Sequence, residues 1–300
     1  MPIDDQRRTF LRVSLAGATA LVLRPALAAP EPGTDALVAR IAALERRHGG
    51  RLGVAIIDTG NGRRVAHRGD ERFPMCSTFK WLAVAAVLAR VDRGEESLGR
   101  RIVFTPAEVV TYSPITESRT GEPGMSLAEV CQAALRLSDN TAGNLLLDRV
   151  GGPAGVTAFA RSVGDQATRL DRRETMLNEA TPGDPRDTTT PSAMAGAMQA
   201  VLLGDVLAAA SRERLVTWMA ASTTGTARLK AGLPAGWRVV DKTGTSNNGV
   251  SNDLAIAWPP SRAPLLVAAY YAESPLDGDA REAVLAEVGR LAANVVPGSV

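Results

Sequence analysis

A serine and a lysine three residues apart suggest nucleophilic chemistry. Ser77 and Lys80 bound the segment Ser-Thr-Phe-Lys, and the apolar pattern that follows predicts a helix opening at Ser77. Both side chains then lie on one face, where the lysine amine can take or relay the hydroxyl proton. Taken alone this tetrad is weak evidence, because an N-cap serine beside a solvated lysine is its default interpretation.

A second serine comes just before another predicted helix, in the triplet Ser138, Asp139 and Asn140. In a functional interpretation Ser138 passes a proton to a leaving nitrogen, and Asn140 hydrogen-bonds an amide of the substrate. We expect a structural task for Asp139. All three residues are also ordinary helix-capping types, which is the alternative for the triplet alone.

A lysine inside a predicted strand forms the third motif, Lys242, Thr243 and Gly244. Strand alternation sends Lys242 and Gly244 to one face and Thr243 to the other. Near a cleft, Lys242 can polarise Ser138 and bind a carboxylate, and the backbone N–H groups of Ser77 and Thr245 can form an oxyanion hole. The alternative is a lysine on the surface of a strand.

Glu174 and Asn178 add a base beside an amide, which suits the positioning of a water molecule for hydrolysis. They lie in a polar stretch, residues 169–187, that is rich in proline and glycine and predicts a long surface loop. Arg172 and Asp187 are placed to pair across its base. Together the motifs predict acyl transfer through a serine, with release by water.

Two further residues have less specific signals. Arg228 follows a Thr-Thr-Gly-Thr-Ala segment and is a candidate second anchor for a carboxylate, with a surface salt bridge as the alternative. Tyr112 is a candidate cleft wall or a minor core residue. His48 and His67 stand far from every motif, and no cluster has metal-ligand spacing, so the sequence predicts neither a metal nor another cofactor.

The predicted elements place strands at both ends of the chain and helices between them. This pattern predicts an α/β fold, an antiparallel sheet flanked by helices and built from both chain ends, with an inserted all-helical lobe and the motifs at the seam. The α/β lobe is expected at about residues 35–70 and 221–300, and the helical lobe at about 71–220. The expected strands are 51–58, 63–68, 237–245, 252–258 and 265–272, and the expected helices include 35–47, 77–91, 126–137, one from Pro191 to Gly204, and 279–294.

The N-terminus has the composition of an export signal over residues 1–28, followed by one catalytic domain at 29–300. Arg7 and Arg8 precede a short apolar run and an Ala-Leu-Ala segment, which favours the twin-arginine route and a periplasmic or secreted location. Four arginines against two aspartates in this leader account for the net charge of +2. The near-neutral remainder gives no support to nucleic acid as a partner, and the run is too short for a membrane anchor.

The chain has two cysteines, Cys76 and Cys131. Export would permit a disulfide between them, but Cys76 lies beside the proposed nucleophile and Cys131 on a separate predicted helix, which favours two buried thiols.

With these motifs in this order, the chain resembles the class A serine β-lactamases over nearly all of its length after the leader. The segment from Arg169 to Arg172, and the one from Arg186 to Thr189, also resemble the ends of the family's Ω-loop. The resemblance implies that Ser77 attacks a β-lactam carbonyl, that Ser138 and Lys80 deliver a proton to the ring nitrogen, and that Glu174 and Asn178 direct water at the acyl-enzyme. It implies a monomer, a small β-lactam substrate and no cofactor, and it leaves the acylation base open between Lys80 and Glu174.

Two cysteine pairings known in the family are not possible here. In one, the partner of the cysteine at position 76 would stand where this chain has Ser246, and in the other, the partner of Cys131 would stand at Val84. The sequence therefore gives no support to carbapenem hydrolysis and leaves the choice among penicillins and cephalosporins open.

Three other classes of protein share some of the motifs. A penicillin-binding peptidase acting on D-Ala-D-Ala does not need Glu174 and Asn178, and a serine-lysine glutaminase does not need Lys242. A sensor domain that stays acylated would be a binding module, typically tethered to a membrane.

Overall fold

The computed structural model describes residues 32–296. The predicted export signal, residues 1–28, lies outside these residues. No helix in the described part of the chain is long and apolar enough to cross a membrane.

A five-stranded antiparallel sheet, in the order β2-β1-β9-β8-β7, joins the two ends of the chain. Its strands are β1 (Arg51–Asp58), β2 (Arg64–His67), β7 (Arg238–Ser246), β8 (Val250–Trp258) and β9 (Leu265–Ala272). The central strand β9 pairs with β1 on one side and β8 on the other, with Val54 opposite Ala269 and Asp253 opposite the same residue. The sequence of β9 is a continuous apolar run because both faces of the sheet are covered. The predicted strands and the α/β class are confirmed.

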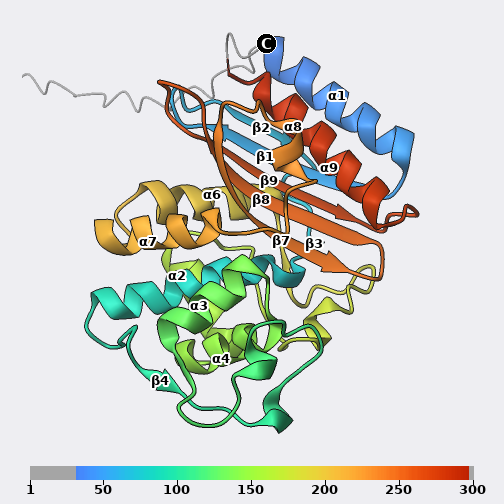
Figure 1. Ribbon diagram of the computed structural model, residues 1–300. Helices are drawn as coiled ribbons and strands as arrows, with labels where there is room; N and C mark the ends of the chain where they lie inside the picture. The colour runs from blue at the N-terminus through green and yellow to red at the C-terminus, as the bar shows by residue number, and fades with distance from the viewer. Residues whose placement is uncertain (1–31, 297–300) are drawn as a thin grey trace, which may run out of the picture. The chain divides into compact units, whose positions relative to one another are not determined.

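Helices from the two chain ends cover one face of the sheet, as Figure 1 shows for α1 (Pro32–His48) and α9 (Gly278–Ala293), with the short α8 (Leu229–Gly232) beside α9. Their apolar side chains and the residues of this sheet face form one buried cluster, which includes Ile41, Val267 and Val288. The expected helices 35–47 and 279–294 are therefore confirmed, with ends shifted by one to three residues.

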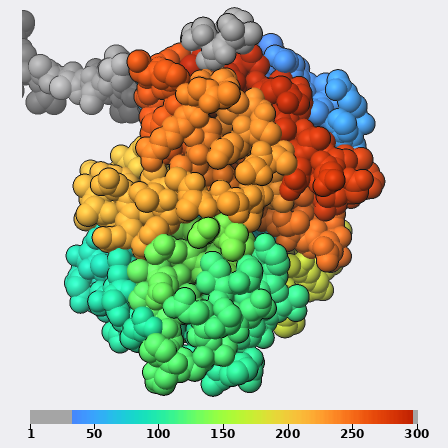
Figure 2. Space-filling model, viewed as in Figure 1, coloured from blue at the N-terminus to red at the C-terminus, as the bar shows by residue number. Residues whose placement is uncertain are grey.

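The other face of the sheet packs on α6 (Pro191–Leu203) and shares a larger core with the helices in the middle of the chain. These are α2 (Phe79–Asp92), α3 (Leu127–Arg136), α4 (Asn140–Val150), α5 (Gly152–Ser162) and α7 (Ala209–Ala220). Figure 2 shows the yellow-orange surface of residues near 200–220 between the orange and red C-terminal elements and the green helices. Helix α2 is the centre of this core, with every side chain from Phe79 to Ala89 buried.

Capping residues set the start of two of the expected helices. Ser126 and Glu129 form a reciprocal capping box at the start of α3, and Thr190 accepts from Ala193 N before Pro191 opens α6. The segment from 76 to 91 differs from the prediction. Ser77 lies in a 3₁₀ turn, η1 (Cys76–Thr78), and the α-helix begins only at Phe79.

Shorter elements complete the chain. They are the strands β3 (Phe73–Pro74), β4 (Arg101–Ile102), β5 (Met125–Ser126) and β6 (Thr188–Thr189), and the 3₁₀ turns η2 (Pro106–Glu108), η3 (Thr116–Ser118) and η4 (Met176–Asn178). β3 pairs with β6, which fixes the end of the long loop beside the segment that leads into Ser77. Both cysteines are buried and unpaired, as predicted.

Candidate active site

The hydroxyl of Ser77 lies between a lysine and a carboxylate. Its Oγ accepts a hydrogen bond from Lys80 Nζ at 2.8 Å and donates to Glu174 Oε1 at 3.2 Å. The preceding residue, Cys76, has φ +45°, a left-handed conformation that is unfavourable for residues other than glycine. Local structure therefore turns the chain sharply just before the hydroxyl, which stands at the amino end of α2.

Lys80 lies at the centre of the polar side chains that surround Ser77. Its side chain is fully buried, and Nζ contacts Ser138 O and Asn140 Oδ1 at 2.7 Å and Glu174 Oε1 at 2.9 Å. Burial lowers the pKa of Lys80, against the opposing effect of the Glu174 carboxylate. The amine is therefore easier to deprotonate than an exposed lysine, which is what proton transfer from Ser77 requires.

A glycine on α4 makes room for this amine. A Cβ atom at Gly143 would lie 2.8 Å from Lys80 Cε and 3.6 Å from Glu174 Cγ. Any larger residue there would displace the lysine or the carboxylate.

Two asparagines hold Glu174 in place. Asn178 Nδ2 donates to Glu174 Oε2 at 2.5 Å, while Asn144 contacts the backbone N and O of Glu174, each at 2.9 Å. The Oδ1 atom of Asn178 is buried without a hydrogen-bond partner among the described residues. Asn144 was not among the residues predicted from the sequence. Its position four residues after Asn140, on the same face of α4, was the available signal.

A second lysine and serine lie on the opposite wall. Lys242 Nζ donates to Ser138 Oγ at 2.9 Å, and Ser138 has φ +59°, which turns its side chain out from the start of α4. Burial, and next the positive charge of Lys80, hold the pKa of Lys242 well below its ordinary value. Asp139 caps α4 and binds the backbone of Ile115 and Thr116, so it orders the neighbouring loop.

The carboxylate-anchor candidates lie along β7. Arg228 is only 5% exposed and donates to Thr245 Oγ1 at 2.8 Å, to two backbone carbonyls and to Glu282 at 3.0 Å. The salt bridge considered from sequence does form, with Glu282, but Arg228 is buried and not on the surface. Thr243 Oγ1 lies 2.7 Å from Thr224 Oγ1, on the side of the strand away from Lys242.

A cavity of about 840 Å³ opens over these groups. The predicted site residues that line it are Ser77, Tyr112, Ser138, Asn140, Asn178, Arg228, Thr243, Gly244 and Thr245. Lys80, Glu174 and Lys242 do not line the cavity, because they are buried behind Ser77 and Ser138. Tyr112 is 56% exposed at the rim, which excludes the core alternative for it.

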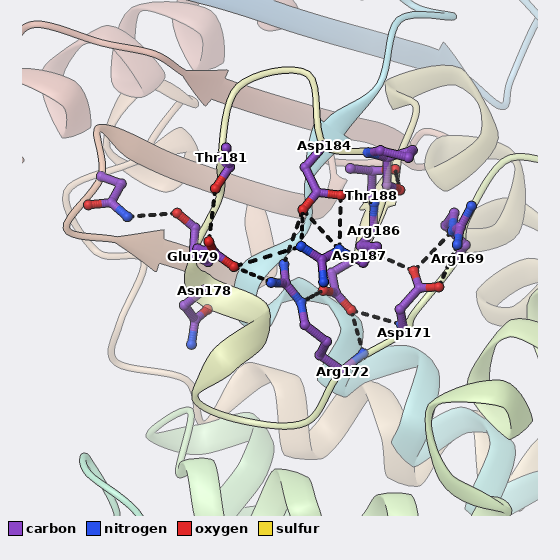
Figure 3. A network of polar contacts seen from close by, with 12 residues as sticks. Arg169, Asp171, Arg172, Asn178, Glu179, Thr181, Asp184, Arg186, Asp187 and Thr188 are labelled. Carbon is purple, nitrogen blue, oxygen red and sulfur yellow. Dashed lines mark hydrogen bonds and ion pairs between the residues drawn. The ribbon is translucent and has the colours of Figure 1, made fainter.

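The loop that carries Glu174 is held by a network of ion pairs, shown in Figure 3. Arg172 lies at its centre, with Nε 2.5 Å from Asp187 Oδ2 and a second nitrogen bound to Glu179. The other oxygen of Asp187 accepts from the backbone N–H groups of Asp171 and Arg172, each at 2.8 Å. The pairing of Arg172 with Asp187 confirms the prediction, and it is buried.

The β7–β8 turn contacts the same loop. Ser246 Oγ donates to Asn178 O, and Asn248 Nδ2 donates to Glu179 O, both at 2.6 Å. These contacts join the two walls of the cavity beside Asn178. Among residues 32–296, no group of three or more His, Cys, Asp or Glu side chains could hold a metal ion.

Comparisons with known proteins agree with this geometry. A model of the beta-lactamase enzyme family matches residues 36–296. The chain is 49% identical to beta-lactamase AST-1 of Nocardia asteroides, over 95% of this chain and 94% of that protein. It is 47% identical to beta-lactamase CTX-M-8 of Citrobacter amalonaticus, over 84% and 86% of the two chains.

Solved structures show the same similarity. An ancestral (GNCA) class A beta-lactamase aligns with a TM-score of 0.85 and 61% identity, covering 87% of this chain and 100% of that one. A putative class A beta-lactamase, PenP of Rhodopseudomonas palustris, aligns with a TM-score of 0.86 and 56% identity, over 87% and 100%.

Proposed function

The chain belongs to the beta-lactamase enzyme family and has the class A fold, and we propose that it hydrolyses the amide of β-lactams through an acyl-enzyme on Ser77. The observation that carries this proposal is the position of Ser77 Oγ, which contacts both Lys80 Nζ and Glu174 Oε1 on the wall of an open cavity. A nucleophile in contact with two proton acceptors suits both formation and hydrolysis of an ester.

Acylation forms a bond between Ser77 Oγ and the lactam carbonyl carbon and breaks the bond from that carbon to the ring nitrogen. The serine proton passes to Lys80 or Glu174, and Ser138 gives its own proton to the ring nitrogen. The proton removed from Ser77 is passed on to Ser138 and replaces the one given to the ring nitrogen, while Lys242 hydrogen-bonds the Ser138 hydroxyl and Lys80 contacts the Ser138 backbone oxygen. The backbone N–H groups of Ser77 and Thr245 are our assigned oxyanion donors, each worth about 3 kcal/mol in related sites.

Deacylation uses the pair on the long loop. Glu174 takes a proton from a water molecule held with Asn178, the water oxygen bonds to the acyl carbon, and the proton returns to Ser77 Oγ as the ester bond breaks. The contact from Asn178 Nδ2 to Glu174 Oε2, which holds the carboxylate beside Ser77, supports this role.

Substrate binding follows from the cavity lining. We assign the substrate carboxylate to Lys242, Thr243, Thr245 and Arg228, and the side-chain amide to Asn140, with Gly244 allowing close approach to β7. Tyr112 forms the rim. Hydrolysis of β-lactams would give its host antibiotic resistance, and we propose export of a monomer after removal of residues 1–28, by the twin-arginine route, into the periplasm or medium.

The test is intact mass over time after mixing the mature protein with excess benzylpenicillin, together with ultraviolet absorbance of the lactam. Many turnovers with at most a transient adduct support the hydrolase. A stable one-to-one adduct would instead identify a sensor or a D-Ala-D-Ala peptidase. Ser77→Ala should form no adduct, and an adduct on that variant would remove Ser77 as the nucleophile.

A further inference from the structure

Asn252 is a buried amide on β8 that contacts the segment leading into the nucleophile. Its side chain is fully buried, and Nδ2 donates to Pro74 O at 2.8 Å and to Met75 O at 3.1 Å. No residue around it in sequence belongs to a motif of the site. The amide therefore joins the sheet to a loop 177 residues earlier in the chain.

The carbonyl of Met75 is a fixed point of that loop. It also accepts from Thr78 N at 3.2 Å and from Thr78 Oγ1 at 2.8 Å, so it closes the turn that contains Ser77. Within this turn Cys76 has its left-handed φ of +45°. A non-glycine residue stays in this conformation only where surrounding contacts hold it.

Strand β7 packs against the same carbonyl oxygen of Met75. Gly244 pairs with Asn252 in register, and a Cβ atom at Gly244 would lie 2.5 Å from Met75 O. Met75 O is thus held between the backbone of Gly244 and the amide of Asn252. The two assigned oxyanion donors are close by in the chain, because Thr245 follows Gly244 and Ser77 comes two residues after Met75.

The unpaired oxygen of this amide argues against a space-filling role. Asn252 Oδ1 is buried and has no hydrogen-bond partner among the described residues. Burying an unsatisfied acceptor is unfavourable, so an apolar side chain of the same shape would fill the space better. What such a side chain lacks is the pair of donors to Pro74 and Met75.

We propose that Asn252 is a positioning residue that fixes the separation between Ser77 N and Thr245 N, and so the geometry of the oxyanion hole. The inference rests on the proposed acyl-enzyme function. Both acylation and deacylation pass through a tetrahedral oxyanion, so both rates depend on Asn252. Initial binding of the substrate carboxylate does not, because Arg228 contacts only the backbone oxygen of Asn252.

The experiment compares Asn252→Leu, which keeps the shape and removes the donors, with the parent protein. Acylation is followed by intact mass in a Glu174→Gln background, which traps the adduct with benzylpenicillin. Deacylation is followed in proteins that keep Glu174, by the loss of the adduct after a rapid pulse of the same drug. We expect both rate constants to fall about tenfold to a hundredfold, the usual cost of a misplacement near 1 Å, with the initial dissociation constant unchanged.

A second readout isolates the oxyanion hole. Phenylboronic acid forms a tetrahedral adduct on a serine hydroxyl and carries no carboxylate. Its inhibition constant, measured with a chromogenic cephalosporin as the substrate, should rise in Asn252→Leu by the same factor by which the acylation rate constant falls. Asn252→Ser, with a shorter side chain that does not reach both carbonyls, should give the same pattern and serves if the leucine variant does not fold.

Ile256→Ala is the matched control. Ile256 is a fully buried residue of the same strand whose side chain belongs to the core shared with α2, and its truncation lowers stability while Asn252 keeps both of its donors. We expect parental acylation and boronate affinity despite a lower Tm. Asn252 variants with a lower Tm but parental rates would overturn the inference and leave the proposed function intact, whereas a parent protein that neither forms an adduct with benzylpenicillin nor consumes it would overturn both.

Discussion

Lys80 Nζ lies 2.9 Å from Glu174 Oε1, and both side chains are fully buried. The pair connects α2, which follows the nucleophile, to the long loop that is anchored by Arg172 and Asp187. Since Ser77 Oγ contacts both members, the serine proton has two acceptors and the acyl-enzyme has one carboxylate directly beside it.

Removing the carboxylate should separate the two half-reactions. In Glu174→Ala, Ser77 and Lys80 remain in contact, so benzylpenicillin should still acylate the serine, while deacylation falls by about 10²–10⁴-fold with the loss of a general base. Intact mass should show a persistent adduct. Turnover of penicillin at the parental rate would remove the water-activating role of Glu174.

Removing the strand lysine should weaken recognition of the substrate's carboxylate. Lys242→Ala should lower kcat/KM for benzylpenicillin by about 10–100-fold, as a lost hydrogen bond to a charged group costs ~1.5–3 kcal/mol. The methyl ester of the same drug is the matched substrate and should lose less. Equal losses on the acid and the ester would count against a carboxylate anchor and leave only the contact with Ser138.

Breaking the buried ion pair of the long loop should affect stability and deacylation together. Asp187→Ala leaves Arg172 and two backbone N–H groups without their acceptor, and we expect about 3 kcal/mol loss of unfolding free energy in urea. Deacylation should slow more than acylation, because the loop carries Glu174 and Asn178.

The control for that variant is Asp148→Ala, which removes an exposed pair between α4 and Arg173 of the same loop. Such surface pairs contribute at most about 1 kcal/mol. If Asp148→Ala lost as much unfolding free energy as Asp187→Ala, any ion pair on the loop would have this effect on stability. Burial of the Arg172–Asp187 pair would then not be the reason.

Acid should destabilise the protein partly through Glu45 on α1. Burial by itself would raise its pKa, but hydrogen bonds from Arg68, Leu52 N and His67 lower the pKa of Glu45 from 4.5 to about 2. The unfolded chain therefore binds a proton before the folded one does as pH falls. The stabilisation is complete above about pH 4.5 and is lost as pH falls through 2.

Glu45→Gln tests this relation. Unfolding free energies in urea from pH 7 to pH 2 should show a parent that is more stable at pH 7 by about 2 kcal/mol and a difference that shrinks below pH 4.5. A constant difference across that range would mean that Glu45 titrates alike in the folded and unfolded chains.

Local sequence patterns were sufficient for the secondary structure that positions the site. The alternation around Lys242 correctly sends its side chain to the face opposite Thr243, and the helices expected from residue 126 and from Pro191 begin within one residue of their predicted starts. These features depend on residues within one turn or one strand, so a single segment contains all the information. The 3₁₀ turn at Ser77 was missed, because tertiary contacts to Met75 O hold it.

The sequence by itself determined the family, the order of the motifs and the residue types of the site, since nucleophile, amines and carboxylate are each chemically distinctive. Only the tertiary structure decided which of them touch. The burial that lowers the pKa of Lys80 and Lys242, the contacts of Asn144 with Glu174 and the contact of Asn252 with Met75 all join segments far apart in the chain. Desolvation and these long-range hydrogen bonds exist only once the sheet and the helices have packed together.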